Sequence, residues 1–509
     1  MGCAEFLKWH PSSRKASQLQ HESEYIISAL IQSPCKGIAI LKDKYEFGLH
    51  SQLWDDHVFN TIIRLSLERV IKTNSLSQSL KDTVDWFSSL DHELFLPYVR
   101  RVENPERFRT AFWNVNSYAQ VLSSRFHDHW VAGSEASEPR PSKLLNNNKS
   151  LKKILFILKG PYELAHVEFL NALLHGSNYF SSVIEVHLLL LDATKNSARH
   201  SGIQVVSFSE IKSTFDKLKK YRSYCCMQDF DSICWVACVQ NLTLYMGMQT
   251  CPSQAYLSMK YHSIIMPTIQ KYAGIGSSSV AFSFDTIDWF RGRAFPHLSL
   301  KSKNDEFCLC AKKKFCITDS SFVMGCFVRS EKLHNIGYWR VIEELLSEFN
   351  KAVFVFASQD IPLNIQDYLS RSLFRDRIKH LGWVDTKAWC YVLDLYVDSF
   401  PRGSGNTMFE AIFAHVPCLI MDTPENRESS ALNYIDSTNA TKSALGITRD
   451  ADGHVIEARK IIQSSAYAKF IAANQFNVLQ RLKNSSHIFA KDYLNYFLDS
   501  SFTLSSDAS

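Results

Sequence analysis

The pattern of hydrophobic and polar positions divides the chain into three parts. From residue 22 to about 130, apolar residues recur every three or four positions, as at Ile62, Ile63 and Val70, which is the spacing of amphipathic helices. Residues 132–150 are instead rich in Ser, Pro, Asn and Lys, and a segment that can bury so little is typical of a linker. We therefore predict an all-helical domain at 1–131 and a linker at 132–150.

After the linker, short apolar runs alternate with helical patterns. The run Ile154–Leu158 is typical of a strand in the middle of a parallel sheet. A helical pattern follows through Ala165, Phe169 and Leu173. Further strands are expected in three apolar segments, at residues 183–191, 205–206 and 233–236. This alternation predicts a first Rossmann-like domain over residues 151–318.

From residue 322 onward the alternation is more regular. Strands are expected at Phe322–Phe327, Ala352–Ala357, Arg377–Leu381, Leu395–Phe400 and Cys418–Asp422. Helices are expected between and after them at Tyr338–Phe349, Ile365–Ser372, Lys387–Leu393, Thr407–His415, Val455–Leu482 and His487–Leu498. The pattern predicts a second doubly wound domain over residues 319–509. Two such domains in tandem are expected to bind a ligand between them, at the carboxyl ends of their strands.

Composition narrows the class of protein. The 509 residues carry 56 Lys and Arg against 51 Asp and Glu, a surplus too small and too dispersed to indicate a nucleic-acid partner. No window approaches the roughly 18 apolar residues of a membrane span, and no signal-peptide layout is present, so we expect a cytoplasmic protein. In a cytoplasmic protein, its 13 cysteines are expected to be reduced thiols. Cys308, Cys310 and Cys316 lack a fourth ligand at zinc-site spacing, so no metal is expected.

The segment from Leu395 to Ala411 carries the strongest candidate chemistry. A predicted strand runs up to Pro401, a glycine-rich loop follows, and Asn406 and Thr407 open a helix. Backbone amides of such a loop and the dipole of the helix N-terminus favour phosphate. Glu410 lies one turn later, where its carboxylate could accept hydrogen bonds from ribose hydroxyls. An ordinary turn, with Asn as N-cap and Glu as a dipole partner, explains the same residues without a ligand.

The order of features around this segment resembles the donor-binding half of GT-B glycosyltransferases. The features are the Gly382-Trp383 turn, a helix, a strand ending in Asp-Ser-Phe-Pro, the glycine loop and Val416-Pro417. Over residues 322–432 the chain looks most like the O-linked N-acetylglucosamine transferase family and the bacterial cytoplasmic N-glycosyltransferases. The resemblance implies an enzyme with two Rossmann-like domains that uses a nucleotide-sugar, a UDP-sugar in particular, and needs no other cofactor. Its acceptor would be a protein, a glycan or a small molecule.

The resemblance also implies roles for individual residues. Lys332, in a segment that includes Arg329, falls where the family places a lysine on the donor diphosphate. An ammonium there would neutralise the charge on the leaving nucleotide without a metal. The loop that meets the donor phosphates corresponds to Gly403, Gly405, Asn406 and Thr407, and the acidic ribose position corresponds to Glu410.

Two positions depart from the family pattern. Gly405-Asn406-Thr407 stands where the family has His-Thr-Thr, so one phosphate-contacting side chain is missing or replaced, and His415 replaces a small residue. The glutamate that the retaining branch pairs with a residue like Glu410 is absent from the glycine loop, which favours the inverting branch. These departures keep a catalytically degenerate binding or scaffold module open as an alternative, beside a sugar-nucleotide epimerase of the same build.

Two features of the first domain are candidates for the acceptor side. His166 follows the first predicted strand, where the resemblance implies a histidine facing the acceptor, and an imidazole there could accept its proton. A capping or core histidine is the structural alternative. The aromatic and polar residues from Trp235 to His262 either line the acceptor side of the site or form ordinary buried packing.

Overall fold

A computed structural model describes most of the chain beyond the predicted linker. It covers residues 151–159, 165–193, 202–236, 242–258, 268–275, 288–292 and 301–498 without 430 and 437–441, and isolated positions elsewhere. The positions that it describes between 21 and 126 are all helical. The linker and the bounds of the predicted helical domain lie outside the described residues.

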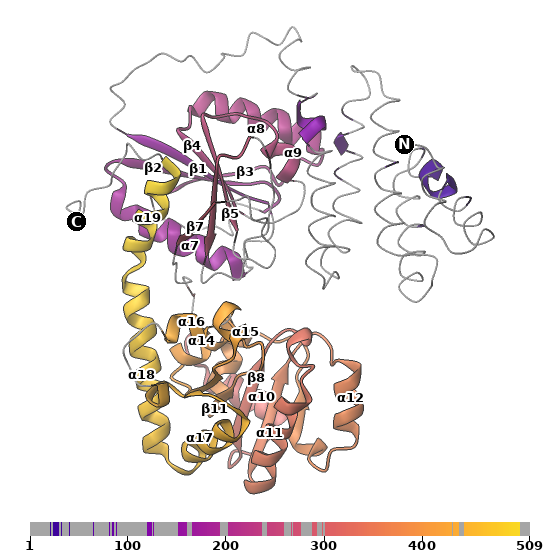
Figure 1. Ribbon diagram of the computed structural model, residues 1–509, viewed down its shortest axis with the longest axis vertical. Helices are drawn as coiled ribbons and strands as arrows, with labels where there is room; N and C mark the ends of the chain where they lie inside the picture. Colours follow the sequence, from indigo (N-terminus) through magenta and orange to yellow (C-terminus); the bar gives the residue numbers. More distant parts are fainter. Residues whose placement is uncertain are drawn as a thin grey trace.

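The first domain is built on a seven-stranded, all-parallel sheet with the order β3-β2-β1-β4-β5-β6-β7 (Figure 1). Its strands are β1 (Lys152–Leu158), β2 (Ile184–Leu190), β3 (Gln204–Ser207), β4 (Ser232–Val236), β5 (Ser253–Ser258), β6 (Lys271–Ile275) and β7 (Trp289–Gly292). The four predicted strands are confirmed as β1 to β4, whereas β5, β6 and β7 carry no clear apolar run and were not predicted. The helices of this domain include α7 (Ala165–Ser177), α8 (Thr214–Gln228) and α9 (Leu242–Met246).

Residues from the amino-terminal part of the chain contact the start of α8. The carboxylate of Asp85 accepts hydrogen bonds from the hydroxyl of the N-cap residue Ser213, at 3.1 Å, and from the amide of Phe215, at 3.2 Å. The ring of Phe126 packs edge-on against Phe215, with centroids 5.3 Å apart. These contacts join the amino-terminal part to the first Rossmann-like domain.

The second domain has a six-stranded parallel sheet with the order β10-β9-β8-β11-β12-β13. Its strands are β8 (Phe322–Phe327), β9 (Ala352–Ala357), β10 (Ile378–His380), β11 (Leu395–Val397), β12 (Cys418–Met421) and β13 (Ile447–Thr448). Its helices include α10 (Asp305–Lys314), α11 (Ile336–Glu348), α12 (Leu363–Ser370), α13 (Thr386–Trp389), α14 (Asn406–Phe413), α15 (Pro424–Ser429), α16 (Leu432–Ile435), α17 (Ala451–Gln463) and α18 (Ser465–Asn484). The prediction of two parallel-sheet domains is therefore confirmed.

Two predicted helices differ from those in the structure, and one open alternative is decided in part. The predicted helix at 387–393 is the one-turn helix α13 followed by a 3-10 turn, Cys390–Val392. The predicted helix at 455–482 is two helices, because Ser464 is extended and its hydroxyl accepts a hydrogen bond from the amide of Tyr467, which starts α18. In the aromatic segment, Trp235, Tyr245 and Tyr256 are buried packing residues of the first domain, while residues 259–265 lie outside the described part.

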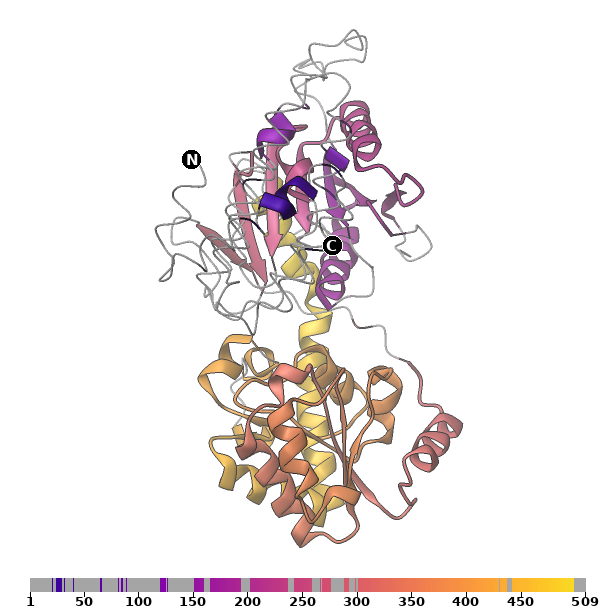
Figure 2. The ribbon, with the colours of Figure 1, turned by 90° about the vertical axis from the view of Figure 1, so that its right-hand side faces the viewer.

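The carboxyl-terminal helices cross from the second domain to the first (Figure 2). Helix α18 packs on the second domain, and α19 (Ser486–Leu498) packs against α7 and the first sheet. The hydroxyl of Tyr493 in α19 donates to the carbonyl of Gly274 in β6, at 2.7 Å. In the described part of the chain, no helix combines the length and apolar character needed to cross a membrane.

Candidate active site

The glycine loop folds onto the buried carboxylate of Asp398, which directly follows β11. One carboxylate oxygen of Asp398 accepts hydrogen bonds from the amide and the hydroxyl of Ser404, at 2.8 and 2.7 Å. A Cβ atom added at Gly403 would lie 2.0 Å from the other oxygen, Oδ2. That oxygen is buried and has no hydrogen-bond partner among the described residues. Only glycine therefore fits at position 403, and the loop backbone is held close to the end of the sheet.

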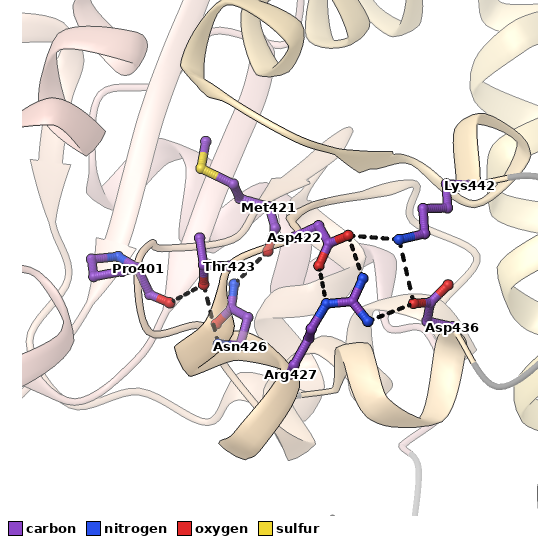
Figure 3. Close-up of polar contacts among 8 residues, drawn as sticks. All are labelled: Pro401, Met421, Asp422, Thr423, Asn426, Arg427, Asp436 and Lys442. Carbon is purple, nitrogen blue, oxygen red and sulfur yellow. Dashed lines mark hydrogen bonds and ion pairs between the residues drawn. The ribbon is translucent and has the colours of Figure 1, made fainter.

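The loop that follows β12 also holds the glycine loop in place (Figure 3). The side-chain oxygen of Asn426 accepts a hydrogen bond from the amide of Gly403, while its NH₂ group donates to the carbonyl of Met421, at 2.8 Å. The hydroxyl of Thr423 donates to the carbonyl of Pro401, at 2.6 Å. The loops after β11 and β12 are thus fixed to each other at Pro401 and at Gly403.

Lys332 lies directly against this loop. It ends a 3-10 turn, Ser330–Lys332, that follows β8, and its ammonium donates a hydrogen bond to the carbonyl of Gly403. Burial lowers the pKa of Lys332, and the nearby charge of Asp398 opposes that shift. Burial also raises the pKa of Asp398, to about 7, against the hydrogen bonds from Ser404 and the charge of Lys332. The structure therefore brings together Lys332 and Gly403, which sequence reasoning had linked only through the resemblance.

Thr407 lies at the start of α14 with its hydroxyl already engaged. The hydroxyl donates to the carbonyl of Phe327 at the end of β8, at 2.7 Å, and lies 3.2 Å from the hydroxyl of Tyr396. The backbone N–H groups of Asn406 and Thr407, the first two residues of α14, lie too early in the helix for an intrahelical acceptor. Thr407 thus joins α14 to the sheet, and the helix start can meet an anion through its backbone.

Asn406 contacts a residue of the other domain. Its side-chain NH₂ group donates to Oε2 of Glu168 in α7, at 2.5 Å. The ammonium of Lys387 in α13 contacts Oε1 of the same carboxylate, at 3.1 Å. Burial raises the pKa of Glu168, and Lys387 and Asn406 oppose the shift. Neither Glu168 nor Lys387 was predicted as a site residue, because their side chains meet only through the tertiary fold.

Glu410 is buried one turn into α14, where its Oε2 accepts a hydrogen bond from the hydroxyl of Thr386, at 2.6 Å. Burial raises its pKa to about 7, against that hydrogen bond, and the neighbouring charge of Glu168 adds to the rise. A carboxyl group at this pKa is divided between its neutral and charged forms near neutral pH.

The contacts described above do not include the side chains of the other predicted residues. Arg329 is exposed and pairs with Glu331, at 2.8 Å. A Cβ at Gly405 would meet no atom of the described residues within 4 Å. His166 belongs to the first turn of α7, but its side chain lies outside the described part, so its role stays a prediction. His415 adopts a left-handed backbone, with φ of 59°, and stacks on Phe476 with centroids 4.3 Å apart.

A separate ion-pair cluster lies beside Asn426 and its hydrogen bonds (Figure 3). Asp422 accepts from Arg427, at 2.5 Å, and from Lys442, at 2.6 Å, and both cations also contact Asp436, at 3.5 and 3.7 Å. Burial favours the neutral acid, but these hydrogen bonds leave the pKa of Asp422 below its usual value. The cluster is a structural support of the loop after β12. Among the described side chains, no group of three or more His, Cys, Asp or Glu is arranged to hold a metal ion.

Comparison with known proteins identifies the fold. No family model matches the sequence, and no curated protein matches it. A mutant O-GlcNAc transferase of Thermobaculum terrenum is similar in structure, with a TM-score of 0.50 and 12% identity over 96% of this chain and 98% of that one. TarM of S. aureus, in a complex with UDP, has a TM-score of 0.47 and 10% identity over 68% of this chain and 100% of its own. The HepE protein of Anabaena, in complex with UDP-glucose, has a TM-score of 0.44 and 13% identity over 67% and 99%. With its two parallel-sheet domains and its likeness to the transferase of Thermobaculum terrenum along nearly the whole length of both chains, this chain has the GT-B fold.

Proposed function

We propose that the protein is a glycosyltransferase that moves a sugar from a nucleotide-sugar, a UDP-sugar in particular, to an acceptor. The observation that carries the proposal is the contact of the Lys332 ammonium with the carbonyl of Gly403, beside the first turn of α14. This arrangement puts a cation, a glycine loop and a helix N-terminus at the carboxyl edge of one parallel sheet. That edge is where doubly wound folds bind nucleotides.

In the proposed reaction, the bond between the anomeric carbon and the donor diphosphate breaks while the acceptor forms a new bond to that carbon from the opposite face. Lys332 and the start of α14 would stabilise the negative charge on the departing diphosphate, without a catalytic metal. Glu410 would accept hydrogen bonds from the ribose, and His166 would take the acceptor proton. Inversion at the anomeric carbon is part of the proposal, as is the class of acceptor: protein, glycan or small molecule.

One observation favours a second candidate, a binding module without turnover. The hydroxyl of Thr407 is committed to the carbonyl of Phe327, and the amide of Asn406 to Glu168. Two side chains that the resemblance places on the phosphates thus already have partners within the protein. A module of this kind would bind the nucleotide without releasing it from a sugar.

The test measures nucleotide binding and turnover separately. We expect UDP to bind more tightly than GDP or CDP in calorimetric titrations, and Lys332→Ala to weaken UDP binding by about tenfold or more, since a charged hydrogen bond is lost. Lys351→Ala is the matched control, because Lys351 is exposed and precedes β9 at the opposite edge of the sheet. Release of UDP from UDP-sugars supports the transferase. UDP binding without release supports the module, and the absence of nucleotide binding contradicts both.

A further inference from the structure

The Glu168 carboxylate connects the two domains at the candidate active site. It extends from α7, which lies on the side of the first domain facing the second (Figure 1). Its two oxygens contact the ammonium of Lys387 and the side-chain amide of Asn406, at 3.1 and 2.5 Å. The side chain of Glu168 is 14% exposed and that of Lys387 is 23% exposed. The contact is therefore largely shielded from water, unlike an ordinary surface ion pair.

Packing around Glu168 holds the contact in place. The next residue, Phe169, lies against the ring of Tyr434, with centroids 6.4 Å apart. Tyr434 in turn packs edge-on against Phe409 of α14, with centroids 5.5 Å apart. Helix α7 is thus fitted to α14 and α16 by aromatic rings, and this fit directs Glu168 to the first residue of α14.

The groups that Glu168 occupies are suited to a phosphate. An ammonium attracts a carboxylate or a phosphate by its positive charge, and an amide NH₂ group donates a hydrogen bond to an oxygen of either. Asn406 is the first residue of the helix whose start is proposed to meet the donor phosphates. Glu168 also lies close enough to Glu410 to raise the pKa of that acid, so a further anion placed here would be repelled by both carboxylates.

We propose that Glu168 is an interdomain latch that occupies Lys387 and Asn406 in the ligand-free protein and is displaced by a phosphate of the nucleotide donor. The inference rests on the proposed function, because it takes the start of α14 as the donor site. Donor binding then breaks the Glu168 bridge between the domains and transfers Lys387 and Asn406 to the phosphate. The carboxylate lowers donor affinity in two ways, by competing for these groups and by repelling the phosphate.

The test compares UDP affinity in the full-length protein and in Glu168→Gln and Glu168→Ala. The glutamine variant keeps the size of the side chain and an acceptor for Asn406 but removes the charge that holds Lys387. We expect both variants to bind UDP about threefold more tightly or better in calorimetric titrations, since half a kcal/mol or so gives such a change. Without ligand, both variants should melt at or below the temperature of the wild type. A variant that stabilises the whole fold would instead raise the UDP affinity and the ligand-free melting temperature together.

The control is Glu348→Gln, which makes the same charge change at an exposed pair with Arg459 in the second domain, and it should leave UDP affinity unchanged. If the wild type binds UDP and the Glu168 variants bind it equally or less well, the latch is wrong while the donor site stands. If the wild type fails to bind UDP but the variants bind it, the latch is supported in its strongest form. If none of the proteins binds any nucleotide, the latch and the proposed function are both wrong.

Discussion

At the scale of single residues, two glycines of the same loop have opposite surroundings. A Cβ at position 403 would meet Asp398 Oδ2 at 2.0 Å and Asn426 Oδ1 at 2.8 Å, whereas a Cβ at position 405 would meet no atom of the described part of the chain within 4 Å. We expect Gly403→Ala to cost about 3 kcal/mol of folding free energy, through overpacking, and to abolish nucleotide binding. Gly405→Ala should change stability by no more than about 0.5 kcal/mol. Urea unfolding of the two variants checks this, and equal losses would contradict the tight loop geometry.

The ionisation of Asp398 gives a second prediction at this scale. Burial raises its pKa to about 7, so the folded protein holds a proton that the unfolded chain releases near pH 4. This contribution to stability is present below pH 4 and is lost as the pH rises through about 7. Asp398→Asn stays neutral throughout, so from pH 4.5 to pH 8 its stability relative to wild type should improve by about 3 kcal/mol.

Urea unfolding of both proteins at the two pH values measures this change. A constant difference would mean that Asp398 is already ionised at pH 4.5, and that the charge of Lys332 outweighs the cost of burial.

Site residues could be predicted from the sequence only where neighbouring positions along the chain form a recognisable pattern. Gly403, Asn406 and Glu410 lie within one strand-loop-helix segment, so a strand end and a glycine loop were enough to select them. Asp398 lies within the same predicted strand, but its role as the anchor of the loop follows from burial, which the pattern does not give. Glu168 reaches the site from a different domain and had no local signal at all.

At the scale of secondary-structure elements, the apolar run is clearest in a strand whose two faces are both buried among apolar side chains. Strand β9 reads Ala-Val-Phe-Val-Phe-Ala and is buried throughout, so its run is continuous. Strands β5 and β6 contain Ser, Gln, Lys and Tyr, and their polar groups are accommodated by specific partners. One example is buried Gln254, whose side-chain oxygen accepts from the indole of Trp235, at 3.0 Å. A pattern of hydrophobicity does not contain such pairings.

The attachment of α18 to the second sheet depends on one buried amide. Gln475 accepts a hydrogen bond from the amide of Cys418, at 3.0 Å, and donates to the carbonyls of Cys418 and Leu445, both at 2.7 Å. We expect Gln475→Leu to lower the free energy of unfolding of the second domain by about 2–4 kcal/mol, because it leaves buried backbone groups without partners. Gln480→Leu, in the same helix, should have little effect, because the side chain of Gln480 donates to Asn484 in an exposed hydrogen bond, at 3.1 Å. Chemical denaturation of the two variants compares them, and similar losses would show that burial of the leucine compensates.

At the scale of the whole molecule, the chain crosses back to its first domain at the end of the described structure. Residues of α19 belong to the core of the first domain: Ala490, Tyr493, Leu494, Phe497 and Leu498. Helix α18, which precedes α19 directly, belongs to the second domain through Val478 and Leu479. The first Rossmann-like domain therefore completes its core only after the second has been synthesised, and the stability of one depends on a segment attached to the other.

This arrangement predicts how a single core residue of α19 affects the two domains. Tyr493 fills the space over Gly292, where a Cβ would lie 2.3 Å from its ring, and it packs edge-on against Phe290 with centroids 5.2 Å apart. Tyr493→Ala removes this packing and the hydrogen bond to Gly274, so we expect a loss of about 3–5 kcal/mol from the first domain. The second domain should keep its stability, because α17 and α18 are unchanged.

Differential scanning calorimetry of Tyr493→Ala should then show two transitions, one at a lowered temperature and one near the wild-type temperature. The control Asp492→Ala, at an exposed position of the same helix, should melt like wild type. A single transition shifted as a whole would instead show that the two domains unfold as one cooperative unit, with α18 and α19 transmitting the loss between them.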